Sequence, residues 1–250
     1  MLHYDSVKFD YSPYPIGVVR PAFDAAVYEE MVAAFPTPAE FASRDELGVK
    51  SALSSKTTSR RYWRYVRSHD IWRRFHAYIS GGSFIDDTLD MLEENSIAFD
   101  KLYRKRDWAT RIRRRASDVL RRQPFRHTPK LRSRFEFSAM PATGGSIRPH
   151  TDLPSKIITL VIPMIGDEGW NADHGGGTSV VWPKDPTRSY NEVNQMIDFD
   201  DVENLRTYAF EPNQALVFVK TFNSWHAVWP MTGDDENVLR RSLTVNIEAF

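Results

Sequence analysis

The sequence predicts an α+β chain in which a double-stranded β-helix, or jelly roll, forms the second half and helices from the first half pack outside it. Two segments before residue 100, 24–35 and 83–95, carry apolar residues at helical spacing. From residue 134 onward the pattern changes to short β-rich runs separated by Pro, Gly, Asn and Asp. Short antiparallel strands that close over a small site, with helices outside, are typical of a jelly roll.

Each predicted element has its own pattern. The first helix carries Val27, Met31 and Phe35 on one side, and the second carries Phe84 and Leu92. The later runs are short, rich in β-branched and aromatic residues, and bounded by turn residues, as strands are. The predicted strands are 134–140, 156–162, 178–182, 206–210, 215–220 and 241–248.

Length and composition favour a single domain. The chain has 250 residues without a low-complexity linker, so we expect a single domain over 1–250, mainly helical to 130 and mainly stranded from 131. Cysteine is absent, which excludes disulfides and thiolate ligands, so redox chemistry would need a metal or cofactor. No run of eighteen apolar residues and no signal-peptide pattern is present, so we expect a cytoplasmic location without a membrane partner.

Charge is balanced overall but concentrated locally. The formal net charge is zero, yet residues 101–134 hold fourteen Lys or Arg against Asp107 and Asp118. Such a block is typical of a surface that attracts a polyanion. A helix with a solvated basic face is the favoured explanation, because Trp108 and Ile112 supply an apolar side. Both interpretations stay open.

The most informative residues are three that could share one metal ion. His150 and Asp152 lie two apart in Arg-Pro-His150-Thr-Asp152, and residues two apart on an extended segment point to the same face. His226 follows the apolar run 215–219, a predicted strand that could end beside them. Two imidazoles and one carboxylate form the facial ligand set of non-haem Fe(II) oxygenases, which leaves positions open for other ligands.

The C-terminal segment alternates polar and apolar residues. Arg240, Ser242 and Thr244 share one face of the predicted strand, whereas Arg241 lies on the other. An arginine inside a barrel needs an anion, and its planar guanidinium binds a carboxylate through two parallel hydrogen bonds. Either arginine could instead lie on a solvated face.

With these motifs the chain resembles the 2-oxoglutarate and Fe(II)-dependent dioxygenases, particularly the prolyl-hydroxylase-like branch. The motifs span about residue 135 to the C-terminus and are Arg-Pro-His150-Thr-Asp152, 175–180, 218–226 and Arg240-x-Ser242-x-Thr244. The resemblance implies that His150, Asp152 and His226 hold iron. It also implies that Arg240, fourteen residues after the distal histidine, pairs with the far carboxylate of 2-oxoglutarate.

The same resemblance implies an enzyme that consumes O2 and 2-oxoglutarate, releases succinate and CO2, and hydroxylates a small polar or anionic substrate. The chain departs from the branch in one place: many relatives have a tyrosine on the strand before the His-x-Asp motif, and the stretch 134–140 has none. We therefore expect Thr159, Ser242 and Thr244 to supply the other cosubstrate contacts.

Residues near the ligands in sequence are candidates for the substrate pocket. Arg148 lies two before His150, Trp225 precedes His226, and Trp170 lies near the glycine-rich turn. The polar segment 48–67 is interpreted either as a lid that contacts substrate or as a plain surface connection.

Two other classes of function fit parts of the sequence. One is a cupin-like protein that binds a metal or small ligand without turnover, since this barrel hosts unrelated functions. The other is a basic nucleic-acid-binding protein that uses 101–134. We expect a small-molecule substrate rather than nucleic acid, and a homo-oligomer is compatible with the sequence.

Overall fold

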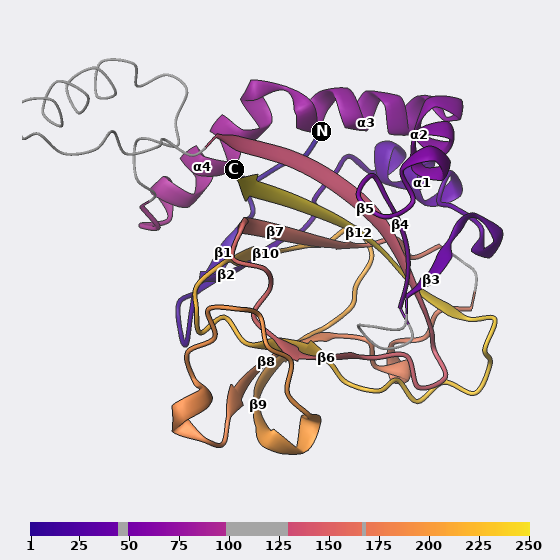
Figure 1. The fold of residues 1–250 in the computed structure, drawn as a ribbon. Helices are drawn as coiled ribbons and strands as arrows, with labels where there is room; N and C mark the ends of the chain where they lie inside the picture. Colours follow the sequence, from indigo (N-terminus) through magenta and orange to yellow (C-terminus); the bar gives the residue numbers. More distant parts are fainter. Residues whose placement is uncertain (45–49, 99–129, 167–168) are drawn as a thin grey trace, which may run out of the picture.

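The computed structural model describes residues 1–44, 50–98, 130–166 and 169–250. It is a mixed structure of helices and antiparallel sheets (Figure 1). The basic block therefore lies outside the described residues over 101–129. The α-helices are α1 (Ala25–Ala33), α2 (Ser59–Ser68), α3 (Asp70–Ser80) and α4 (Gly82–Glu94), and short 3₁₀ helices include Pro38–Glu40, Ala172–His174, Pro186–Arg188 and Phe199–Asp201.

In this part of the chain the strands form two antiparallel sheets. The larger has eight strands in the order β1-β2-β10-β7-β12-β5-β4-β3, and the smaller has four in the order β6-β11-β8-β9. The strands of the large sheet are β1 (Lys8–Asp10), β2 (Ile16–Val19), β3 (Ala42–Arg44), β4 (Lys50–Ser54), β5 (Leu131–Pro141), β7 (Lys156–Pro163), β10 (Ala215–Val219) and β12 (Leu239–Ala249). Those of the small sheet are β6 (Ile147–His150), β8 (Thr178–Pro183), β9 (Val202–Tyr208) and β11 (His226–Val228).

The central strand β12 shows how the large sheet separates two environments. It pairs with β5 on one side and β7 on the other. Leu243, Val245 and Ile247 point into the main hydrophobic core, whereas Ser242 and Thr244 line a cavity on the opposite face. The helices cover the first face, and the small sheet lies across the second (Figure 1). The alternation in the sequence therefore sorts core residues from cavity residues.

Aromatic side chains on β5 join the sheet to the helices. Phe137 is fully buried and packs edge-on against Trp72 of α3 at a ring-centroid distance of 4.7 Å, and against Phe35 at 5.6 Å. Phe135 contacts Phe75 of α3 at 5.2 Å. These contacts hold β5 in place, and with it the polar residues that β5 presents to the cavity.

We expect Phe137→Ala to lower the free energy of unfolding by about 3–5 kcal/mol, because it removes a buried ring and leaves a void that the fixed strands cannot fill. Urea unfolding followed by circular dichroism measures this. Tyr190→Ala, at a side chain 66% exposed, is the matched control and should change stability by less than about 0.5 kcal/mol. Equal effects from the two substitutions would contradict the packing described here.

Candidate metal centre

Three side chains meet at one end of the small sheet. His150 ends β6, His226 begins β11, and the two residues are directly paired across the strands. One ligand atom from each histidine and one from Asp152 all lie within 4.8 Å of one another. The Nε2 atoms of His150 and His226 are 3.8 and 3.9 Å from the Asp152 carboxylate oxygens. The structure thus brings together the three residues that the motif singled out.

A turn at the end of the strand brings Asp152 to this point. It lies beyond the end of β6, not on the strand, and its φ of +69° places it in the left-handed region. Aspartate is among the few residues that adopt this conformation readily. The turn swings the carboxylate toward the two imidazoles.

The hydrogen bonds of the imidazoles fix which nitrogen is available. His150 Nδ1 donates to the backbone carbonyl of Arg148 at 2.8 Å, and His226 Nδ1 donates to that of Ser224 at 2.9 Å. A carbonyl oxygen only accepts, so the proton is on Nδ1 and the lone pair of each Nε2 faces the third ligand. Burial lowers the pKa of His150 to about 3 and also lowers the pKa of His226, so both rings are neutral at neutral pH.

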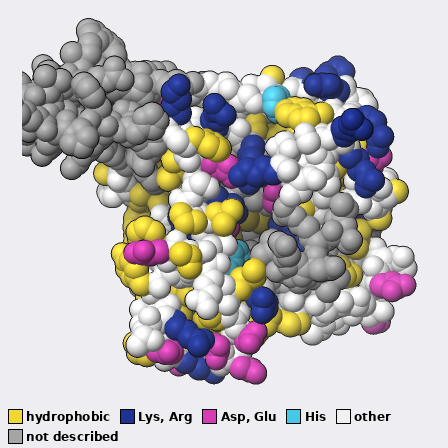
Figure 2. Space-filling model, in the orientation of Figure 1, with side chains coloured by type: hydrophobic (Ala, Val, Ile, Leu, Met, Phe, Trp, Pro, Cys, Tyr) yellow, Lys and Arg dark blue, Asp and Glu magenta, His cyan; other side chains and the backbone are white. Residues whose placement is uncertain are grey.

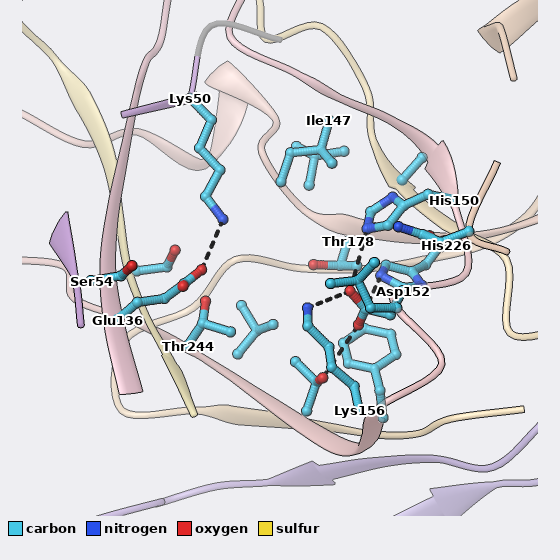
Figure 3. A pocket seen from close by; sticks show the side chains of 18 of the residues that line it. Lys50, Ser54, Glu136, Ile147, His150, Asp152, Lys156, Thr178, His226 and Thr244 are labelled. Carbon is cyan, nitrogen blue, oxygen red and sulfur yellow. Dashed lines mark hydrogen bonds and ion pairs between the residues drawn. The ribbon is translucent and has the colours of Figure 1, made fainter. Parts of the chain in front are cut away.

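The carboxylate of Asp152 is held ionised and oriented. Burial is the largest single influence and would raise its pKa, but the charge and hydrogen bond of Lys156, together with the two neighbouring histidines, outweigh burial and lower the pKa. Lys156 Nζ lies 2.5 Å from Oδ1 (Figure 3). Thr159 donates to Oδ2 at 3.2 Å. The ammonium shows that a cation is favoured beside this oxygen. Two neutral imidazole nitrogens and one carboxylate suit Fe(II), so the donor set fits the metal that the motif implies.

The metal ligands open into a cavity of about 340 Å³ between the two sheets. This volume suits a small molecule. Figure 2 shows a hollow near the middle of the face, with basic and acidic side chains around it. The predicted cosubstrate residues Arg240, Ser242, Thr244 and Thr159 all line the cavity.

Arg240 is the most unusual of these residues. It is 3% exposed, its Nε donates to the carbonyl of Gly176 at 2.6 Å, and its guanidinium lies over the Phe210 ring at 4.1 Å. Burial lowers its pKa to about 9, so it keeps its charge at neutral pH. Among the residues that the structure describes, no carboxylate pairs with it. A buried cation without a counter-ion is costly, and an anionic ligand would remove that cost.

Two further buried polar atoms lie on strands beside residues that line the cavity. Asn246 Nδ2 and Ser138 Oγ are buried, and within the described ranges neither has a hydrogen-bond partner. Asn246 is paired across the sheet with Thr159, and Ser138 with Ser242. Buried polar atoms normally find partners, so these are consistent with a face built around bound molecules.

The three residues predicted to contact substrate do not line the cavity. Trp225 is buried in a separate cluster and donates from Nε1 to the carbonyl of Ser189, because adjacent residues on a strand point to opposite faces and His226 takes the inner one. Trp170 packs behind the cavity wall on Phe210. Arg148 is exposed and pairs with Asp198 at 3.4 Å.

The reason for the position of Arg148 is an irregularity in the pairing. The register of β6 and β11 shifts between His226 and Val228, so Ile147 rather than Arg148 lines the cavity with His150. A bulge of this kind changes the side-chain phase along a strand.

A network of charges on the opposite wall was not predicted from the sequence. Glu136 of β5 lies 3.6 Å from Lys50 Nζ and accepts a hydrogen bond from Arg134 at 3.0 Å. Arg134 also contacts Glu248, which in turn pairs with Lys56. A signal was present: in 134–138 polar residues alternate with buried phenylalanines, the pattern of a strand with one polar and one apolar face. The pairing that brings β4 beside it is long-range.

This network makes stability depend on pH in the acid range. Burial would raise the pKa of Glu136, but the charges of Lys50, Arg134 and Lys156 outweigh burial and lower it to about 2. A lowered carboxyl pKa stabilises the fold above the usual value of 4.5 and loses that contribution as pH falls toward about 2. We therefore expect Glu136→Gln to be less stable than wild type above pH 4.5, with a gap that shrinks as pH falls to 2. Urea unfolding across this range measures it, and a constant gap would contradict the assignment.

Comparisons with known proteins give structural neighbours only. No protein-family model and no curated protein sequence matches the chain. Similar solved structures include a prolyl-4-hydroxylase from Pseudomonas putida (13% identity, covering 96% of this chain and 95% of that chain, TM-score 0.47). Another is a prolyl hydroxylase from Trichoplax adhaerens in complex with a peptide of the hypoxia-inducible factor oxygen degradation domain (10% identity, covering 93% of this chain and 83% of that chain, TM-score 0.45).

A third neighbour is SnoN, a non-haem α-ketoglutarate-dependent epimerase of nogalamycin biosynthesis (11% identity, 93% of this chain and 76% of that chain, TM-score 0.44). At these identities and TM-scores the chemistry of the chain is inferred from its own site. In the described part of the chain, no helix is both long and apolar enough to cross a membrane.

Proposed function

We propose that the chain is an Fe(II)- and 2-oxoglutarate-dependent oxygenase that hydroxylates a small polar or anionic substrate. The observation that carries the proposal is the convergence of His150, Asp152 and His226, with both Nε2 lone pairs and an ionised carboxylate facing one point of a cavity. The strand order supports it. The strands β5 to β12 divide four and four between two facing sheets, the arrangement expected of a double-stranded β-helix.

Each residue has a role that follows from its position. His150, Asp152 and His226 would hold the metal on one side and leave the cavity side open. Arg240 would bind the far carboxylate of 2-oxoglutarate, with Ser242 and Thr244 as hydroxyl donors on the same face. Thr159 contacts Asp152 directly, so its first role would be to orient the metal-binding carboxylate. When bound, Fe(II) with 2-oxoglutarate and O2 supplies the oxidising chemistry, which releases succinate and CO2.

The chain itself would bind the cosubstrate, orient it and exclude water from it. The walls of the cavity come from both sheets, so the cosubstrate would be enclosed between Arg240 and the metal ligands. Neutral imidazoles and an ionised aspartate need no proton rearrangement before a metal binds at neutral pH. Retention of the Asp152 carboxylate favours hydroxylation over halogenation, because halide chemistry in the resembled family requires that ligand to be missing.

The proposal is tested with anaerobically purified protein. Calorimetry should show one Mn(II) or Fe(II) site per chain and 2-oxoglutarate binding that depends on the metal. Admission of O2 to the Fe(II) form should release succinate slowly without substrate and faster when an anionic substrate is found. Metal binding with no succinate under any substrate screen would favour the non-catalytic metal-binding alternative. Nucleic-acid binding that weakens steeply with salt and survives His150→Ala would favour the other alternative, a basic nucleic-acid-binding protein.

A further inference from the structure

The wall of the cavity that faces the metal ligands is strongly charged. Lys50 of β4 and Glu136 of β5 lie on the side opposite His150 and Asp152 (Figure 3). The Lys50 side chain is 11% exposed, and both it and Glu136 line the same cavity as the metal ligands. This wall is therefore placed to contact whatever lies between itself and the metal.

Positive charge exceeds negative charge in this cavity. The lining includes two acidic residues, Glu136 and Asp152, with Glu248 close behind them. The charges of a divalent metal ion and of dianionic 2-oxoglutarate would cancel one another. Their binding would therefore leave the excess of positive charge in the cavity unchanged. The basic residues of the lining are Lys50, Lys56, Arg134, Lys156 and Arg240. A substrate that carries a negative charge would balance them.

Lys50 has the most capacity left for an anion. Lys156 is engaged by Asp152 at 2.5 Å, and Lys56 is engaged by Glu248 at 2.9 Å. Lys50 has one ion pair within the described ranges, a long one of 3.6 Å to Glu136. That carboxylate is already shared with Arg134, so an ammonium with three donors is only partly satisfied.

We propose that Lys50 is the substrate's anion-binding residue, which holds a carboxylate or phosphate group across the cavity from the metal ligands. Glu136 is its positioning residue: it holds the ammonium inside the cavity and weakens its attraction for anions. The inference rests on the proposed function, because an anion anchored at Lys50 would extend the rest of the molecule toward the metal. It adds a substrate class, small oxyanion-bearing molecules, and names the side chain that selects it.

The test uses the full chain with two simple probes, inorganic phosphate and acetate, measured by equilibrium dialysis. It is done on metal-free protein and on protein loaded with Mn(II) and saturating 2-oxoglutarate. Lys50→Met should weaken probe binding by about tenfold or more, the loss expected for one charge-assisted hydrogen bond. Glu136→Gln should strengthen it several-fold, because it frees Lys50. Lys184→Met, at an exposed lysine that donates to the carbonyl of Asp200, is the control and should change nothing.

The two variants are expected to change probe affinity in opposite directions, and this separates a binding role of Lys50 from a structural one. If Lys50 served only to neutralise Glu136, neither variant would change probe affinity, and that result would overturn the proposal. Phosphorus-31 and carbon-13 signals of the probes should also broaden in the Mn(II) form, because anion and metal share one cavity. Binding without such broadening, or binding lost in Arg240→Ala but kept in Lys50→Met, would place the anion elsewhere and reject the assignment. Preference for one probe identifies the group as phosphate or carboxylate.

The two proposals fail in different ways. Normal metal and 2-oxoglutarate binding, combined with equal probe affinity in wild type and Lys50→Met, would reject the anion site and leave the oxygenase intact. Loss of probe affinity in Lys50→Met, combined with no metal binding in wild type, would reject the oxygenase. Circular dichroism of each variant establishes that it is folded before binding is measured.

Discussion

Asp152→Ala is expected to reduce metal-dependent succinate release to below detection while the protein stays folded. The substitution removes the only carboxylate of the triad and leaves two neutral imidazoles, which cannot neutralise a divalent ion. It also leaves Lys156 without its 2.5 Å partner, but that side chain is 16% exposed and borders a cavity, so water can solvate it. We expect a stability cost of about 1–3 kcal/mol.

Calorimetric titration with Mn(II) and an assay for succinate measure this prediction, and circular dichroism confirms the fold. Asp198→Ala is the matched control, because Asp198 is an exposed aspartate that pairs with Arg148 outside the cavity. The control should bind metal and release succinate as wild type does. If Asp152→Ala bound Mn(II) with unchanged affinity, the metal would have to lie at other residues.

Arg240→Ala is expected to raise the concentration of 2-oxoglutarate needed for half-maximal turnover by about thirtyfold or more. Loss of one partner from a buried charge pair costs about 2 kcal/mol or more, which corresponds to that factor. Maximal turnover should fall less, since Arg240 is not one of the three candidate metal ligands. The effect should be large because Arg240 is buried and its contacts within the described residues are a backbone carbonyl and an aromatic ring, not a carboxylate.

Two further variants sharpen this test. Arg240→Lys retains a charge without the planar fork, so it should recover part of the affinity. Lys50→Met should leave the 2-oxoglutarate requirement unchanged, because that side chain is assigned to substrate. An unchanged requirement in Arg240→Ala would move the role to Lys156, which also lines the cavity, because Arg241 lies on the opposite face of β12.

The sequence predicts the longer helices and strands because their residues follow a local periodic pattern. The helices α1 and α4 follow the apolar spacing of 24–35 and 83–95, and β5, β7, β8, β10 and β12 fall on predicted strands. The strands that carry the two histidines, β6 and β11, have only four and three residues, too few for a periodic signal. The motif therefore located the ligands although their strands could not be predicted.

What the sequence could not supply depends on contacts between distant segments. Lys50 lies in the polar segment 48–67, which is neither a plain lid nor a simple connection: it contains β4, which pairs with β5, and then α2. Pairing across about eighty residues is not visible in local periodicity. Trp225 and Arg148 were chosen for their nearness in sequence, but strand alternation and a register shift turn them away from the cavity.

The measurement that tests the central claim most directly is a crystal structure of the protein with Mn(II) and 2-oxoglutarate, prepared without O2. The account predicts one metal ion bound by Nε2 of His150, Nε2 of His226 and the carboxylate of Asp152. It also predicts that the far carboxylate of 2-oxoglutarate contacts the guanidinium of Arg240. A metal bound by other side chains, or a cosubstrate that lies outside this cavity, would contradict it.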